Sequence, residues 1–132
     1  MEYINLIDIA SKARALAYAP YSKFTVGAAI VTKSGNIFVG CNIENVSLGL
    51  TICAERCAVA APIAQGSRDL VAIVTDSTKP AAPCGACRQV LAEFNPNMKV
   101  FAATFAGEVQ EFELAELLPL PEQGVLEGAR RV

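Results

Sequence analysis

The stretch Pro83-Cys84-Gly85-Ala86-Cys87 is the part of this sequence from which the fold and the chemistry can both be predicted. It opens a predicted helix over 84–94, directly after a proline-rich loop and a short apolar strand at 70–75. An alanine-rich helix over 51–64 precedes that strand and carries Cys53-Ala54-Glu55-Arg56 near its start. A helix, a strand and a helix in this order are typical of an α/β domain in which helices cover a mixed sheet.

The rest of the chain supplies the remaining elements of such a domain. Apolar residues at helical spacing predict an amphipathic helix over 3–17, which Pro20 follows. Two strands, at 24–32 and 36–40, are joined by the turn Ser34-Gly35-Asn36. Further predicted elements are a loop at 42–50, strands at 99–104 and 109–112, and a short helix at 114–118. A chain of 132 residues fits one domain, so we expect a single catalytic domain over residues 1–132.

Three cysteines are the candidate metal ligands. Cys84 and Cys87 are three residues apart at the start of a helix, which turns both thiols to the same side. Cys53 can add a third sulfur from another helix. Three protein ligands with one open position are the catalytic form of a zinc site, whereas structural zinc sites close with four. Helix N-termini also favour the thiolate form.

Two charged residues complete the candidate site. Glu55 follows Cys53 by two residues, so its carboxylate is expected beside the metal, where it can take and return protons. Arg56 is expected to contact the sulfurs and to offset the excess negative charge of three thiolates on Zn²⁺. Other interpretations stay open at this point: a redox Cys-x-x-Cys pair, or a structural zinc site with Cys41 or Cys57 as fourth ligand.

Composition excludes several classes of function. The sequence has no histidine, so Ser-His-Asp and Cys-His mechanisms are excluded. The net charge is −2 and there is no basic run, which argues against a nucleic-acid partner; Arg130-Arg131 is interpreted as a solvated tail. No leader-like segment and no apolar stretch of membrane-spanning length is visible, so we expect a cytoplasmic protein without a membrane partner.

Four motifs in order make the chain resemble the small homotetrameric cytidine deaminases over nearly its whole length. They are Ala19-Pro20-Tyr21-Ser22-Lys23-Phe24 with Val26-Gly27-Ala28-Ala29, then Gly40-Cys41-Asn42-Ile43-Glu44-Asn45, then Cys53-Ala54-Glu55-Arg56, then Pro83-Cys84-Gly85-Ala86-Cys87-Arg88-Gln89-Val90. The Cys-x-Glu and Pro-Cys-x-x-Cys pair is the three-cysteine form of the zinc deaminase pattern.

The resemblance implies a three-layer α/β/α sandwich with a five-stranded mixed sheet. It implies Zn²⁺ on Cys53, Cys84 and Cys87, with Glu55 as the proton shuttle. The implied substrate contacts are Asn42 and Glu44 to the sugar hydroxyls, with Phe24 and Ala54 against the nucleoside. The implied activity is the hydrolytic deamination of cytidine and deoxycytidine in pyrimidine salvage by a homotetramer.

Two departures from the family pattern bear on the substrate. Leu48 stands where the family usually has Tyr, and no aromatic residue follows Phe112, although relatives carry a ring there that stacks on the base. Losing a stacking ring costs on the order of 1–3 kcal/mol per base. The departures motivate an alternative substrate, a modified cytosine nucleoside or a nucleoside antibiotic. An alternative of another class is a non-catalytic zinc-binding assembly domain, in which Glu55 would have no use.

Overall fold

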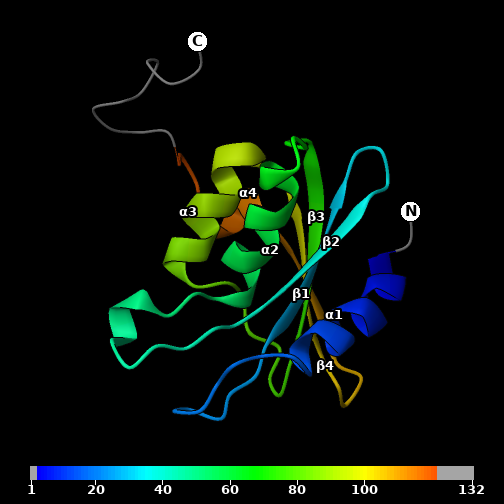
Figure 1. The fold of residues 1–132 in the computed structure, drawn as a ribbon. Helices are drawn as coiled ribbons and strands as arrows, with labels where there is room; N and C mark the ends of the chain where they lie inside the picture. The colour runs from blue at the N-terminus through cyan, green and yellow to red at the C-terminus, as the bar shows by residue number, and fades with distance from the viewer. Residues whose placement is uncertain (1–2, 122–132) are drawn as a thin grey trace.

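A computed structural model describes residues 3–121 of the chain, so the segment 122–132, with Arg130 and Arg131, lies outside the described residues. A five-stranded sheet in the order β2-β1-β3-β4-β5 forms the centre (Figure 1). The strands are β1 (Gly27–Thr32), β2 (Ile37–Cys41), β3 (Leu70–Ser77), β4 (Lys99–Thr104) and β5 (Val109–Glu113). The helices are α1 (Leu6–Arg14), α2 (Ala54–Ala64), α3 (Gly85–Phe94) and α4 (Leu114–Leu117), with single 3₁₀ turns at Tyr3–Asn5 and Leu48–Leu50.

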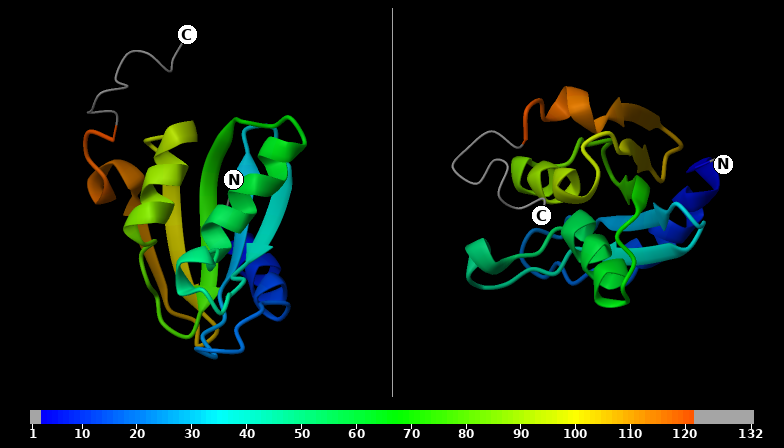
Figure 2. Two further views of the ribbon diagram at one scale, coloured as in Figure 1. Left: turned by 60° about the vertical axis from the view of Figure 1, so that its left-hand side comes forward. Right: turned by 90° about the horizontal axis from the view of Figure 1, so that it is seen from above.

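Helices cover both faces of this sheet, as the views in Figure 2 show. Alternation along β1 directs Ala29 and Val31 to the core under α1. Ala28 and Ile30 face the opposite core, beneath α2 and α3. The pair β3–β4 is parallel and the other neighbouring pairs are antiparallel. The expected three-layer α/β/α sandwich with a mixed five-stranded sheet is therefore confirmed.

Two glycines allow the helices to approach the sheet closely. A Cβ added to Gly27 would lie 1.9 Å from the carbonyl oxygen of Ala10 in α1. A Cβ added to Gly40 would lie 2.4 Å from the amide nitrogen of Ala58 in α2. Real Cβ atoms do not come this close to backbone, so β1 and β2 hold these helices at distances that only glycine allows.

Several predicted boundaries were wrong, for local reasons. The first helix ends at Arg14 rather than at residue 17, and Leu16 is 79% exposed beyond it. Residues 24–26 do not extend β1, because the Asn42 side chain takes their hydrogen bonds: Val26 N–H donates to its Oδ1 and its Nδ2 donates to the Phe24 carbonyl, both at 2.8 Å. α2 begins at Ala54 rather than at 51, since Cys53 is extended and forms its N-cap.

The helices of the described part of the chain fall short of the requirements for crossing a membrane. Among residues 3–121, no helix combines the length and the apolar character that crossing a bilayer requires.

Candidate metal centre and substrate pocket

Three cysteine sulfurs meet where two helices begin. Cys53 is the N-cap of α2 and Cys84 is the N-cap of α3, whose first turn contains Cys87. Their Sγ atoms all lie within 4.8 Å of one another. The Cys53–Cys84 distance is 4.0 Å and the Cys84–Cys87 distance is 3.5 Å. The structure therefore brings together the three residues that the sequence predicted as ligands.

These sulfurs fit the geometry of a tetrahedral zinc site. With Zn–S bonds of about 2.3 Å, two ligands in a tetrahedral arrangement are about 3.8 Å apart. The two measured separations fall on either side of that value. Within residues 3–121, neither Cys41 nor Cys57 joins the group, so the described chain offers three thiols and leaves one coordination position open.

The surroundings of Cys53 favour the thiolate form of its side chain. Hydrogen bonds from Cys87 and Arg56 lower the pKa of the Cys53 thiol to about 5. Arg56 makes its bond from Nη2 to Cys53 Sγ at 3.3 Å, which is the contact that the sequence predicted for this residue. The pKa of Cys87 is raised, because its thiol donates to Cys53 and is buried. Cys53 therefore ionises more readily than Cys87, and thiolate is the form that binds a metal.

Glu55 lies in the first turn of α2, directly beside the cluster. Its side chain is buried, although it also lines a pocket. Burial raises the pKa of the carboxyl, and the neighbouring Cys53 raises it further. A carboxyl group with a raised pKa suits a role in which a proton is first accepted and then delivered near neutral pH.

The pocket beside the sulfurs has a volume of about 280 Å³. It is lined by all four predicted substrate contacts, by two of the three cysteines and by Glu55. The lining residues are Phe24, Val26, Asn42, Glu44, Thr51, Cys53, Ala54, Glu55, Thr75, Ser77, Ala81, Ala82 and Cys84. The structure thus places residues from five separate segments around one cavity. The lining contains two carboxylates and, among the described residues, no Lys or Arg.

The predicted sugar contacts also hold the pocket wall together. The amide of Asn42 is buried and bonds the backbone of Phe24 and Val26. The Glu44 carboxylate accepts the backbone N–H groups of Tyr21 at 2.9 Å and of Ser22 at 3.1 Å. The pKa of Glu44 is lowered, mainly because the Ser22 hydroxyl donates to it. Asn42 therefore holds the backbone of Phe24 and Val26, and Glu44 holds the turn that precedes them. The sequence did not predict these contacts.

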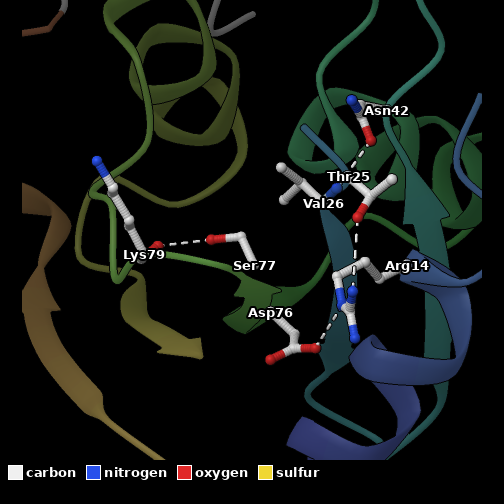
Figure 3. A network of polar contacts seen from close by, with 7 residues as sticks. All are labelled: Arg14, Thr25, Val26, Asn42, Asp76, Ser77 and Lys79. Carbon is white, nitrogen blue, oxygen red and sulfur yellow. Dashed lines mark hydrogen bonds and ion pairs between the residues drawn. The ribbon is translucent and has the colours of Figure 1, made fainter. Parts of the chain in front are cut away.

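An ion pair that the sequence did not reveal joins α1 to β3 beside the pocket-lining segments (Figure 3). Arg14 Nε donates to Asp76 Oδ2 at 2.9 Å, and Asp76 is fully buried. Arg14 Nη1 also reaches the Thr25 hydroxyl at 3.5 Å. Thr25 and Asp76 each stand between two pocket-lining residues, 24 and 26 in one case and 75 and 77 in the other. Along β3, alternation directs Thr75 and Ser77 into the pocket, while Arg14 links Asp76 of β3 to Thr25 in the segment before β1.

A second arginine fixes the loop before the metal ligands. Arg88 donates from Nε to the Pro83 carbonyl at 2.7 Å and from Nη1 to the Leu117 carbonyl at 3.1 Å. It thereby ties the residue before Cys84 to α4. Its place directly after Cys87 in the sequence was the only signal for this function.

Leu48 does not line the pocket. It lies in the 3₁₀ turn Leu48–Leu50 and is 76% exposed. The stretch where the family pattern has a stacking ring is Leu120-Pro121-Glu122-Gln123-Gly124. Leu120 and Pro121 do not line the pocket, and residues 122–124 lie outside the described residues.

Comparison with known proteins agrees with this geometry. Residues 1–104 match the model of the cytidine and deoxycytidylate deaminase zinc-binding region. The cytidine deaminase of Halalkalibacterium halodurans is 51% identical over 122 residues, covering 90% of this chain and 92% of that protein. The cytidine deaminase of Sporosarcina psychrophila is 47% identical, covering 90% of each.

Solved structures give the same result. The crystal structure of cytidine deaminase from Burkholderia pseudomallei superposes with a TM-score of 0.87 at 46% identity, over 90% of this chain and 98% of that one. The cytidine deaminase from Mycobacterium tuberculosis superposes with a TM-score of 0.77 at 38% identity, over 90% and 95%. Sequence, fold and a three-cysteine centre that suits Zn²⁺ agree, and the chain belongs to the cytidine and deoxycytidylate deaminase zinc-binding family.

Proposed function

We propose that this protein is a zinc-dependent hydrolase that converts cytidine and deoxycytidine into uridine and deoxyuridine with release of ammonia. The observation that carries the proposal is the convergence of three sulfurs and a buried carboxyl on one pocket. A zinc site used only for assembly has no need of a buried Glu55 in a pocket wall, so the non-catalytic alternative is not favoured.

Cys53, Cys84 and Cys87 would hold the zinc ion, and Arg56 would balance the charge of their thiolates. When bound, zinc supplies Lewis acidity that lowers the pKa of water toward about 7. The helix N-termini at Cys53 and Cys84 further stabilise negative charge on the sulfurs.

Glu55 carries the proton transfers in this proposal. Its carboxylate accepts a proton from the attacking water and delivers it to N3 of the base, while the water oxygen bonds to C4. Glu55 then takes the remaining proton from that oxygen and passes it to the amino group. The C4–N4 bond breaks and ammonia leaves, so that cytidine and water become uridine and ammonia. The raised pKa of Glu55 makes its carboxylate a better acceptor for the proton of water.

The remaining pocket residues would bind a free nucleoside. Asn42 and Glu44 offer amide and carboxylate groups to sugar hydroxyls, while Phe24 and Ala54 supply apolar walls. The two carboxylates in the lining and the absence of a cation among its described residues disfavour a 5′-phosphate. The same negative charge disfavours a nucleic-acid strand as substrate.

We further propose that residues 1–132 form one catalytic domain that acts in the cytoplasm, in pyrimidine salvage, as a homotetramer. Exposed apolar side chains on the loop between β2 and α2 support an assembled state, with Val46 80% exposed and Leu50 65% exposed. The modified-nucleoside alternative was motivated by Leu48 and by the missing C-terminal ring. Leu48 lies outside the pocket lining and gives that alternative no support, while residues 122–132 lie outside the described part of the chain.

The test is ammonia release from cytidine, deoxycytidine, free cytosine and cytidine 5′-monophosphate, together with metal analysis. We expect one zinc per chain, turnover of both nucleosides, and little turnover of cytosine or the monophosphate. Removal of zinc by a chelator should abolish activity, and added zinc should restore it. Full activity of the metal-free protein, or efficient turnover of free cytosine, would contradict the proposal.

A further inference from the structure

The turn between α1 and β1 is bound to the loop that follows β2. Tyr21 N–H and Ser22 N–H both donate to Glu44 Oε1, and the Ser22 hydroxyl donates to Glu44 Oε2. The two loops also pair through backbone bonds, with Tyr18 N–H donating to the Asn42 carbonyl at 3.0 Å and Glu44 N–H to the Tyr18 carbonyl at 2.8 Å. The side chain of Glu44 therefore binds the turn at Tyr21 and Ser22, in addition to the backbone pairing at Tyr18.

Ser22 has a second contact, toward the aromatic residue of the pocket. Its hydroxyl oxygen accepts the Phe24 N–H at 3.0 Å. The Ser22 hydroxyl thus donates to Glu44, the candidate sugar contact, and accepts from Phe24, the residue that would lie against the nucleoside. Lys23, between them, has φ of +63°, which is uncommon for a residue with a side chain and requires support from its surroundings.

The acceptor capacity of Glu44 shows what this arrangement leaves for a substrate. An ionised carboxylate offers about four acceptor positions. Donors from residues 21 and 22 occupy three of them. Because the Ser22 hydroxyl fixes Oε2 and the two amides fix Oε1, the carboxylate cannot rotate without losing bonds, and the remaining position keeps one orientation.

We propose that Ser22 is a positioning residue for sugar recognition, whose hydroxyl sets the free acceptor position of Glu44. The inference rests on the proposed function, in which Glu44 accepts a sugar hydroxyl and Phe24 contacts the nucleoside. A serine that only stabilised the turn would affect every substrate alike. A positioning serine must matter most for substrates that carry the hydroxyl groups.

The experiment compares KM and kcat of the zinc-loaded protein for cytidine and for 2′,3′-dideoxycytidine. The variants are Ser22→Ala, Ser22→Thr, Glu44→Gln and the double variant Ser22→Ala/Glu44→Gln. The matched control is Ser34→Ala, which removes an exposed serine hydroxyl with side-chain bonds in the β1–β2 turn. Thermal unfolding of each variant measures any effect on the fold.

Ser22→Ala should raise KM for cytidine about tenfold, the effect of losing one charge-assisted hydrogen bond, with kcat within about twofold. KM for dideoxycytidine should change by less than about twofold, Ser22→Thr should recover most of the loss, and Ser34→Ala should behave as wild type. In the double variant, the effects of Ser22→Ala and Glu44→Gln should not multiply, because both act on the same contact.

An equal rise in KM for both substrates would overturn the positioning role. An unchanged KM in Ser22→Ala, with KM raised in Glu44→Gln, would overturn this inference alone and leave the proposed sugar role of Glu44 intact. An unchanged cytidine KM in Glu44→Gln would overturn both.

Discussion

At the scale of single residues, the position of Glu55 in its helix suits the proton transfers that we propose for it. Glu55 is the second residue of α2, so the cysteine that caps the helix and the carboxyl of the first turn share one end of one element. Burial there raises the pKa of Glu55. The pKa of Glu44, on the loop before α2, is lowered instead, mainly because the Ser22 hydroxyl donates a hydrogen bond to its carboxylate. The two carboxyls of one pocket are thus suited to different tasks, proton transfer for Glu55 and stable acceptance of hydrogen bonds for Glu44.

Glu55→Gln should retain zinc and fold but lose more than the roughly 10²–10⁴-fold rate contribution of one general acid–base group, because the same carboxyl serves several proton transfers. Steady-state turnover with metal content measured on the same sample checks this. Glu116→Gln, at the short helix α4 and outside the pocket lining, is the matched control. Turnover of Glu55→Gln within tenfold of wild type would remove Glu55 from the mechanism.

Local spacing predicted the pairing of Cys84 and Cys87, and the family motifs added Cys53 from another helix, whereas polar contacts between distant segments were missed. Cys84 and Cys87 could be paired because helical spacing alone brings them together. Arg14 and Asp76 are 62 residues apart, and no local pattern in either segment points to the other. The hydrogen bonds of Ser22 to Glu44 likewise depend on two loops meeting, which composition and periodicity do not encode.

At the scale of elements, the contact between α2 and the edge strand β2 positions the chemistry. α2 contributes Cys53 as its cap and Glu55 in its first turn, and its height above the sheet is set at Gly40. A Cβ there would also lie 2.7 Å from the carbonyl oxygen of Ala54, a residue of the pocket lining. Close packing at Gly40 therefore acts directly on the metal centre.

Gly40→Ala should destabilise the protein by about 1–3 kcal/mol through overpacking and should lower zinc occupancy, since α2 must move away from the sheet. Urea denaturation and metal analysis measure the two effects. Gly49→Ala is the control, because a Cβ at that position meets nothing within 4 Å. Equal stability and zinc content in both variants would show that α2 can shift at no cost.

Arg14 links α1 to β3 through Asp76 and to the segment before β1 through Thr25. Arg14→Gln should cost about 2–3 kcal/mol of unfolding free energy, because it leaves the buried Asp76 carboxylate without its partner. A double variant, Arg14→Met/Asp76→Leu, should recover part of that loss, since it removes both charges together. Urea denaturation of the three proteins checks it, and a double variant less stable than Arg14→Gln would contradict the argument.

Element order and sheet composition could be predicted because apolar periodicity reports burial. Strand β4 was predicted with its correct ends, and its alternate residues enter the two cores. The ends of α1, β1 and α2 could not be predicted. There, side-chain contacts such as those of Asn42 replace the regular backbone pattern, and the apolar composition continues past the true end.

At the scale of the whole molecule, the pocket opens beside the two loops that carry its sugar-binding candidates. The segments 15–26 and 42–53 lie side by side away from the sheet, as Figures 1 and 2 show, and they are linked by the bridge between Tyr18 and Ile43. Side chains exposed on these segments include Tyr18, Val46, Leu48 and Leu50. A single chain would leave this apolar surface in water, next to its own binding site.

We expect the protein to assemble through this apolar surface. Light scattering should give a mass about four times the 13.9 kDa of the chain. Leu48→Asp/Leu50→Asp should yield smaller species, because assembly would bury the introduced aspartates. A closed symmetric assembly repeats that cost at every copy of the interface. Its KM should rise as well, since Glu44 lies on the same loop. Ala106→Asp adds a charge in the exposed β4–β5 turn and should leave mass and KM unchanged. A wild-type mass equal to one chain would show that the exposed apolar loop has another use.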